Sequence, residues 1–554
     1  MLHSARFLVC LIGLLILVFC FRCHRTYRVF NDTSDEAAHI LCGLEVWQTG
    51  RYTMEAQHPP LARAVVALPP YVAGLRLIKR RDRKTPWSDA LWVDSKPEFY
   101  WRTLSLARLG NLAFAPFLLV YVYLWGRRLY GPAAGLAAAG LVSFSPNLLA
   151  HASLATLDFG AATTTFISTY HFWRWSREPG LRNCLLACVA FAIAVLTKFS
   201  ALFFLPLIAA IFFVLARWRQ WSWRPSAQWL AAMTRGAVFL SVAGLIIWSA
   251  YLFDRGPLPF AQIGPVEGTL GQYLESAVEI ITRHGIIPLP APYFVRGVLE
   301  VLDHDAQGHR GYLLGEIRRY GSWYYFPVVL AVKTTLPFLL LVAMALILGA
   351  AKGAWGAEGG PARSMLCPLL AAAMVLGVSM SSNMNLGVRH ILVIYPFLAL
   401  AASGLFVGGG CFRPAVKRVV VGFAMALAIW HAAESFLAHP DYLAYFNQIA
   451  RGREEEFLLD SNLDWGQDLE RLRRYLEANK ISTLYLSFFG ATDPSRLGMT
   501  GVRRLPPGEI PPGWVALSKN HIAGLGHQAY FPWVKGHSPV ARIGKSILLY
   551  HFSR

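Results

Sequence analysis

Apolar runs of bilayer length recur along this chain, and no other feature constrains its fold as strongly. About eleven of them are near the length that a helix needs to cross a membrane. We predict spans at Phe7–Phe21 and approximately at residues 103–125, 132–150, 157–173, 183–197, 199–216, 235–253, 326–349, 365–381, 390–410 and 418–436. Only 15% of the 554 residues are charged, whereas soluble proteins carry about 25%. The sequence therefore predicts a mainly α, polytopic membrane protein.

Two further apolar features need a separate interpretation. The first run resembles the core of a signal peptide, but Arg22, Cys23, His24 and Arg25 follow it instead of a cleavage site, so we expect an uncleaved helix. Residues 61–78 are also apolar, but four prolines between positions 59 and 70 break up this segment. We expect it to be juxtamembrane or re-entrant rather than a crossing.

Lysine and arginine in short loops predict the orientation, because such loops are cytoplasmic. With the N-terminus inside, the cytoplasmic basic loops are those at residues 127–128, 174–182, 217–235, 352–363 and 413–418. The cluster at residues 79–84 then lies outside, in a loop of about eighty residues, and loops of that length largely escape the rule. The net charge of +20 thus comes from membrane anchors, and we expect no nucleic-acid partner.

Three stretches fall outside the membrane in this topology: residues 22–102, residues 254–325 and a tail from about residue 437. The tail predicts an amphipathic helix near Asp468–Asn479 and strands within Ile481–Phe489, Trp514–Leu517 and Ile543–Phe552. We therefore expect a transmembrane domain at residues 1–436 and a small extracytoplasmic α/β domain at residues 437–554. The chain has no internal repeat, which disfavours a transporter built from inverted halves.

Acidic residues follow the first helix, in the sequence NDTSDEAAH at residues 31–39. Ser34 is placed to cap a helix that runs to about Gly50, and Asp35 and Glu36 fall in its first turn, where the helix dipole favours anions. Such capping would by itself explain an isolated acidic pair. A second motif, EAQHPPLAR at residues 55–63, adds a His-Pro-Pro turn that fixes the backbone sharply.

Together, Asp-Glu-x-x-His and His-Pro-Pro-Leu-x-Arg resemble the first external loop of the protein O-mannosyltransferases and, more loosely, the bacterial aminoarabinose transferases. Both belong to the C superfamily of membrane glycosyltransferases. Further resemblances lie at residues 145–158, 196–200, 321–334, 385–390 and 460–469, so that they cover most of the chain. One departure is Ala56, at the place where the mannosyltransferases usually have Asp. This departure disfavours protein O-mannosylation and leaves the superfamily intact.

The resemblance implies a site for a polyprenyl-phosphate sugar. It implies Asp35 as the general base, Glu36 as the group that positions the base or the acceptor, and Asp158 as the group that orients substrate or supports the base. The expected ligands of the lipid phosphate are cationic side chains, Lys198 and Arg389 first, then His390, His58 and Arg63. His39 and Glu55 are expected to position substrate.

The residues themselves support a shared site. In the topology from loop charges, distant regions bring the following ionisable residues to the outer face: Asp35, Glu36, His39, His58, Asp158, Lys198, Arg389 and His390. Ionisable groups at membrane depth cost roughly 2.5–3.5 kcal/mol, so their presence usually marks function. The alternative is that Asp158 and Lys198 are interfacial, with the Lys198 ammonium reaching the headgroups.

The sequence thus predicts an inverting transfer of a sugar from a polyprenyl phosphate to a protein, lipid or glycan acceptor, on the outer face of a bacterial plasma membrane. The alternative is a transporter or lipid flippase. No cofactor is assigned, and a divalent metal stays open because Asp35, Asp158 and a histidine offer suitable ligands.

Overall fold

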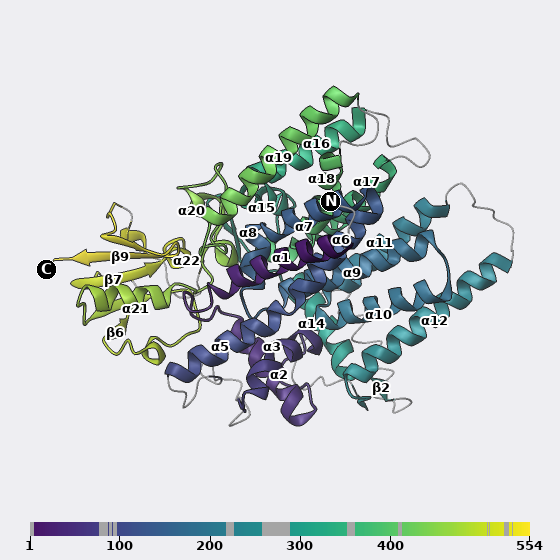
Figure 1. The fold of residues 1–554 in the computed structure, drawn as a ribbon. Coiled ribbons are helices and arrows are strands. Elements are labelled where there is room, and N and C mark those ends of the chain that lie inside the picture. Colours follow the sequence, from purple (N-terminus) through teal and green to yellow (C-terminus); the bar gives the residue numbers. More distant parts are fainter. Residues whose placement is uncertain are drawn as a thin grey trace.

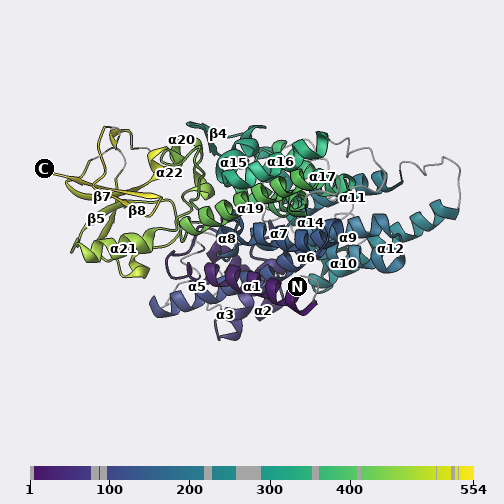
Figure 2. The same ribbon diagram turned by 45° about the horizontal axis from the view of Figure 1, so that its top comes forward.

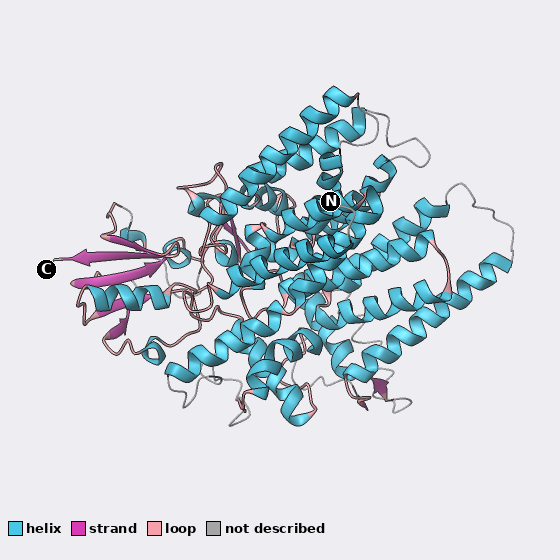
Figure 3. Cartoon of the chain, viewed as in Figure 1, coloured by secondary structure: helices cyan, strands magenta, loops and turns pink. Residues whose placement is uncertain are grey.

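The computed structural model describes residues 5–76, 87, 91, 97–217, 227–257, 288–351, 361–407, 413–506, 508, 510–525, 531–534 and 536–553. The basic cluster predicted at residues 79–84 lies outside the described residues, as do residues 218–226 and 352–360 of the predicted cytoplasmic loops. Helices dominate the described chain, and the largest sheet lies near its C-terminus (Figure 3). Two short strand pairs lie elsewhere: β1 Arg255–Gly256 with β2 Leu289–Pro290, and β3 Gly311–Leu313 with β4 Glu316–Arg318.

Helices occur at every predicted apolar run (Figure 1). Their bounds are α1 Ala5–His24, α2 Glu36–Thr49, α3 Pro60–Val72, α5 Pro97–Leu112, α6 Phe114–Tyr130, α7 Pro132–Ser143, α8 Pro146–Ala152, α9 Asp158–Arg177, α10 Leu181–Thr197, α11 Ser200–Arg217, α12 Ala227–Ala250, α14 Pro292–Gln307, α15 Tyr325–Lys333, α16 Leu336–Ala351, α17 Pro361–Met380, α18 Ile394–Ser403 and α19 Pro414–Leu437. The short helices α20 Glu454–Phe457, α21 Leu469–Ala478 and α22 Lys519–Ile522 lie in the tail.

Four helical segments of the described chain are long and apolar enough to cross a membrane: Arg6–His24, Phe99–Tyr130, Met233–Ala250 and Pro414–Leu437. Two bent pairs, α7 with α8 and α15 with α16, raise this number to six if each pair is one span. The α7–α8 bend of 64° falls at Ser145-Pro146, because the residue before a proline avoids the helical conformation. The number of eleven spans stays a prediction, since several of the other apolar helices have fewer than 18 residues.

The tail forms a five-stranded mixed sheet at one end of the helical part (Figures 1 and 2). Its strands are β5 Leu484–Ser487, β6 Val502–Arg504, β7 Gly513–Ser518, β8 Ala541–Ile543 and β9 Ile547–Phe552, in the order β6-β5-β7-β9-β8. Strand β5 runs parallel to β6 and β7, and the remaining pairs are antiparallel. Apolar side chains of α21 and of this sheet belong to one buried core that also contains side chains of α2, α3 and α5. The predicted amphipathic helix and strands of the tail are therefore present.

Residues 441–465 connect the last long helix to this sheet and pack among the helices. Tyr442, Leu463 and Trp465 are buried in the same core as the membrane helices. The ammonium of Lys333, at the end of α15, donates hydrogen bonds to the backbone oxygens of Leu443 (2.7 Å) and Asn462 (2.6 Å). Buried contacts therefore fix this connecting segment to the helical part.

Helix α2 begins differently from the prediction that Ser34 caps it. The N-cap position is Asp35, whose side chain makes no capping hydrogen bond. Instead, Glu36 accepts a hydrogen bond from the backbone N–H of Thr33 at 2.8 Å, as in the Thr-x-x-Glu capping pattern. The helix ends as predicted at Gly50, which has the left-handed conformation (φ 62°).

Candidate active site

A cavity of about 530 Å³ opens where the start of α2, the His-Pro-Pro turn, the α10–α11 turn and residues 378–390 meet. Most of the predicted site residues line it: Asp35, His39, Glu55, His58, Arg63, Lys198, Arg389 and His390. Three side chains from α14 and the residues after it, His304, Asp305 and His309, also line the cavity. Segments that are far apart in the sequence thus converge on one site.

Asp35 faces Arg389 in this cavity. Its Oδ2 accepts a hydrogen bond from Nη1 of Arg389 at 2.7 Å, and 37% of the Asp35 side chain stays exposed. The guanidinium of Arg389 lies over the ring of Trp465, 4.4 Å from the centroid, which gives a cation–π contact. Arg389 is therefore oriented from two sides, while Asp35 remains accessible to a substrate.

Arg389 also keeps one donor without a partner. Its Nε is buried and makes no hydrogen bond with any described residue. A buried unsatisfied donor costs stability, and in a native structure it calls for an explanation such as a ligand. Because this atom is covered in the structure, an anionic oxygen in the cavity would reach it only after neighbouring side chains move.

Asp158 and Lys198 form a second ion pair beside the cavity. The Nζ of Lys198 lies 2.6 Å from Oδ1 of Asp158, which is buried at the start of α9. Lys198 follows the end of α10, and α9 and α10 form a helical hairpin whose packing brings these two ends together. The helix dipole at the start of α9 favours the carboxylate. The Lys198 ammonium therefore pairs with Asp158. The sequence had left open the alternative that this ammonium extends to the lipid headgroups.

Arg63 organises the His-Pro-Pro turn. Its guanidinium is buried and donates hydrogen bonds to Nδ1 of His39 (3.2 Å) and to the hydroxyl of Tyr52 (2.6 Å), and it pairs with Glu55. All three guanidinium nitrogens are thus engaged within the protein. Burial lowers the pKa of His58 to about 4, so this imidazole is neutral near pH 7. Arg63 and His58 are accordingly weaker phosphate ligands than Lys198 and Arg389.

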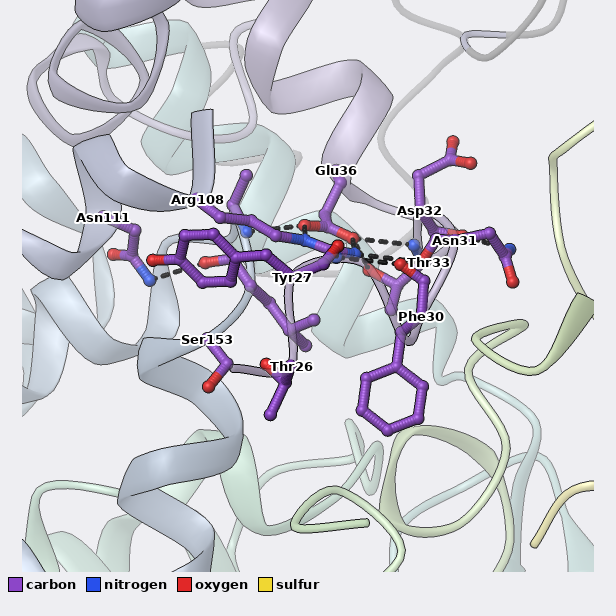
Figure 4. Close-up of polar contacts among 12 residues, drawn as sticks. Thr26, Tyr27, Phe30, Asn31, Asp32, Thr33, Glu36, Arg108, Asn111 and Ser153 are labelled. Atoms are coloured by element: carbon purple, nitrogen blue, oxygen red, sulfur yellow. Dashed lines mark hydrogen bonds and ion pairs between the residues drawn. The ribbon is translucent and has the colours of Figure 1, made fainter. Parts of the chain in front are cut away.

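Two predicted site residues, Glu36 and Asp158, do not line the cavity, and Figure 4 shows the contacts that Glu36 makes instead. Successive residues of a helix point about 100° apart, so Glu36 enters the protein core when Asp35 faces the cavity. Its two oxygens lie 2.8 and 2.9 Å from Nε and Nη2 of Arg108, and both side chains are fully buried. Oε1 also accepts the backbone N–H of Ala155 at 2.7 Å. Glu36 therefore holds the loop in front of Asp35. This agrees with the expectation that it positions the base, whereas its burial argues against contact with the acceptor.

The block at residues 460–469 supports both halves of the Asp35–Arg389 pair. The backbone oxygen of Trp465 accepts the N–H of Ser34 at 3.2 Å. Asn31 donates to the oxygen of Gly466 at 2.7 Å. On the other side, Oδ1 of Asn462 accepts the N–H of Val388 at 3.0 Å. The resemblance to the family had drawn attention to residues 460–469. Nothing in the sequence, however, indicated that these residues contact the loops of Asp35 and Arg389.

The donor set does not fit the metal site that the sequence left open. No group of three His, Cys, Asp or Glu side chains within the described part of the chain is arranged to hold a metal ion. In addition, Asp35 and Asp158 each bind a cationic side chain. We therefore derive no metal-dependent step.

Comparisons with known proteins agree with this fold. Residues 103–248 match the family model described as dolichyl-phosphate-mannose-protein mannosyltransferase. The crystal structure of ArnT from Cupriavidus metallidurans bound to undecaprenyl phosphate is 14% identical, with a TM-score of 0.50, covering 99% of this chain and 98% of ArnT. The apo oligosaccharyltransferase of Archaeoglobus fulgidus is 13% identical, with a TM-score of 0.46, covering 80% of this chain and 56% of the enzyme.

No curated protein matches the sequence. The chain shares the fold of ArnT along nearly its whole length, and residues 103–248 match the mannosyltransferase family model. This chain resembles the membrane glycosyltransferases of the C superfamily, the mannosyltransferases and ArnT among them.

Proposed function

We propose that this protein transfers a sugar from a polyprenyl-phosphate carrier to an acceptor on the outer face of a bacterial plasma membrane. One observation carries the proposal: an accessible carboxylate, Asp35, shares a cavity with two cationic groups, Arg389 and Lys198. A sugar phosphate needs this combination, because the acceptor must lose a proton while the leaving phosphate gains negative charge.

The reaction is a single displacement. The acceptor hydroxyl gives its proton to Asp35 as its oxygen attacks the anomeric carbon of the sugar. The bond from that carbon to the phosphate oxygen breaks, and its electron pair stays on the carrier phosphate. Asp158 is buried and bound to Lys198, so it is poorly placed to attack the sugar itself. This supports inversion without a covalent intermediate.

The carrier phosphate is held by Arg389 and Lys198. Arg389 offers a guanidinium that lines the cavity beside Asp35, and Lys198 adds a point charge. The ArnT structure of the same fold contains undecaprenyl phosphate, and the matching family is described by a dolichyl-phosphate sugar. Both support a polyprenyl phosphate as the donor class.

Deleting the gene in its bacterium tests the proposal. We expect mass spectrometry of surface glycans, lipids and glycoproteins to show the loss of one sugar modification. The wild-type gene restores it, and the Asp35→Asn gene, expressed to the same level, does not. Envelope glycans that are unchanged by the deletion would contradict a transferase. A deletion strain that instead accumulates the fully modified product inside the cell would favour transport.

A further inference from the structure

A second cavity of about 760 Å³ adjoins the first one. Ser34 and His309 line both cavities, so the second begins beside the exposed carboxylate of Asp35. Apart from Arg310, its other described walls come from the tail, where β5, the residues after it and the edge strand β6 contribute. We call this space the tail groove. It leads from the tail sheet to the site of proton transfer.

Positive charge lines the tail groove. Arg503 and Arg504 on β6 are exposed, and Arg310 contributes from the segment after α14. Arg310 and Arg503 make no ion pair with any residue that the structure describes. Among the described residues of the lining, Asp460 is the one carboxylate; burial raises its pKa to about 6, so it is still mostly ionised near pH 7, and the three arginines outnumber it. The groove therefore has a positive potential that attracts anions.

The remaining lining is apolar with a few neutral polar groups. Phe488 and Phe489 follow β5, and Oγ of Ser487 lies 2.8 Å from Nδ1 of His521. Burial and the nearby Arg504 lower the pKa of His521 to about 4, so this imidazole adds hydrogen-bonding capacity and no charge at neutral pH. Apolar walls with a few placed polar groups are typical of a site for a small organic ligand.

We propose that the tail groove binds the acceptor, and that this acceptor is a saccharide carrying phosphate or carboxylate groups. The inference rests on the proposed function, because the groove meets the donor cavity at Ser34, next to the base. A neutral acceptor would cover Arg310 and Arg503 without neutralising them, which disfavours its binding. The arginines therefore select the charge of the acceptor, while the aromatic rings and hydroxyls contact its sugar.

Binding measurements on the full-length protein in nanodiscs test this. Undecaprenyl phosphate is added to saturation, so that the phosphate ligands of the donor cavity are occupied. The probes are glucosamine 6-phosphate, glucuronate and neutral glucose. The binding of each probe is measured by titration with saturation-transfer NMR. We expect the two anionic sugars to bind at least tenfold more tightly than glucose, and more weakly as salt is raised. Equal binding of all three would overturn the proposal.

Variants locate the binding. The double variant R503A/R504A should lose at least tenfold in affinity for the anionic sugars, and R503K/R504K should recover part of it. Arg542→Ala on β8, the opposite edge of the same sheet, is the matched control and should bind as the wild type does. In cells, R503A/R504A should abolish the modification that depends on the gene.

The results separate the two proposals. If R503A/R504A binds the anionic sugars as the wild type does, or keeps the modification in cells, the tail groove is not the acceptor site. If the wild-type protein does not bind undecaprenyl phosphate at all, the proposed function fails, whatever the arginine variants show.

Discussion

Two neighbouring carboxylates, Asp35 and Glu36, have opposite surroundings, and this contrast yields a sharp prediction. Asp35 is 37% exposed and has one partner, Arg389. Glu36 is fully buried and bonded to Arg108 and to two backbone N–H groups. We therefore expect Asp35→Asn to abolish activity with little change in the free energy of unfolding. We expect the main effect of Glu36→Gln to be a lower free energy of unfolding.

The magnitudes follow from the two environments. An ion pair with an exposed partner contributes roughly 0–1 kcal/mol, so Asp35→Asn should lower the free energy of unfolding by no more than about 1 kcal/mol. Losing a general base typically lowers the rate by about 10² to 10⁴. Glu36→Gln leaves the buried guanidinium of Arg108 without its counter-charge, and breaking such a pair costs about 3–5 kcal/mol.

Both variants are compared with the wild type as purified protein in nanodiscs. Tryptophan fluorescence on heating measures unfolding, native mass spectrometry measures undecaprenyl phosphate binding, and transfer is followed with the product identified in the deletion strain. Ser34→Ala, in the same cavity, serves as the control for local disturbance. If Asp35→Asn keeps more than a tenth of the wild-type turnover, Asp35 is not the base. If Glu36→Gln unfolds at the wild-type temperature, the buried pair lacks the structural role given to it.

Three further predictions concern other parts of the molecule. Lys198→Ala should weaken undecaprenyl phosphate binding at least tenfold, and if affinity held while only turnover fell, the phosphate assignment would be wrong. EDTA should leave transfer unchanged, because Asp35 and Asp158 are bound to cationic side chains; activity lost on chelation and restored by one divalent ion would contradict this. Burial raises the pKa of Asp464 from 3.8 to about 7, so the folded state holds a proton that the unfolded state releases between about pH 4 and pH 7. The contribution of Asp464 to the free energy of unfolding should therefore fall with rising pH in that window, by at most about 1.4 kcal/mol per pH unit, and Asp464→Asn should remove this contribution while that of Asp460 remains.

The sequence predicted the secondary structure well because hydrophobic runs and breakers act locally. Helices lie at each apolar run, and the prolines at the α7–α8 boundary and in α3 coincide with a bend and a short helix. The number of membrane spans, in contrast, cannot be obtained from local hydrophobic runs alone. Several helices are shorter than a bilayer requires by themselves, so their crossing depends on how the helices pack and tilt.

The meeting of the site residues was also predictable, but their individual contacts were not. Loop charges placed Asp35, Lys198 and Arg389 on one face, and the structure brings all three to the same cavity. The partner of Glu36 is Arg108, 72 positions along the chain, and no local pattern connects them. His304 is a similar case, since its part in the cavity depends on the position of α14.

The tail forms a separate sheet and also supports the residues of the candidate active site. Asn462 and Trp465 hold the turn that carries Arg389, and Trp465 and Gly466 hold the loop that carries Asp35. Removing the chain from residue 441 onward would therefore disturb the base and the phosphate ligand together with the tail groove. A truncated protein without activity would not reveal which of these was lost. Substitutions on β6 leave the block at residues 460–469 in place, so they can separate acceptor binding from the support of Asp35 and Arg389.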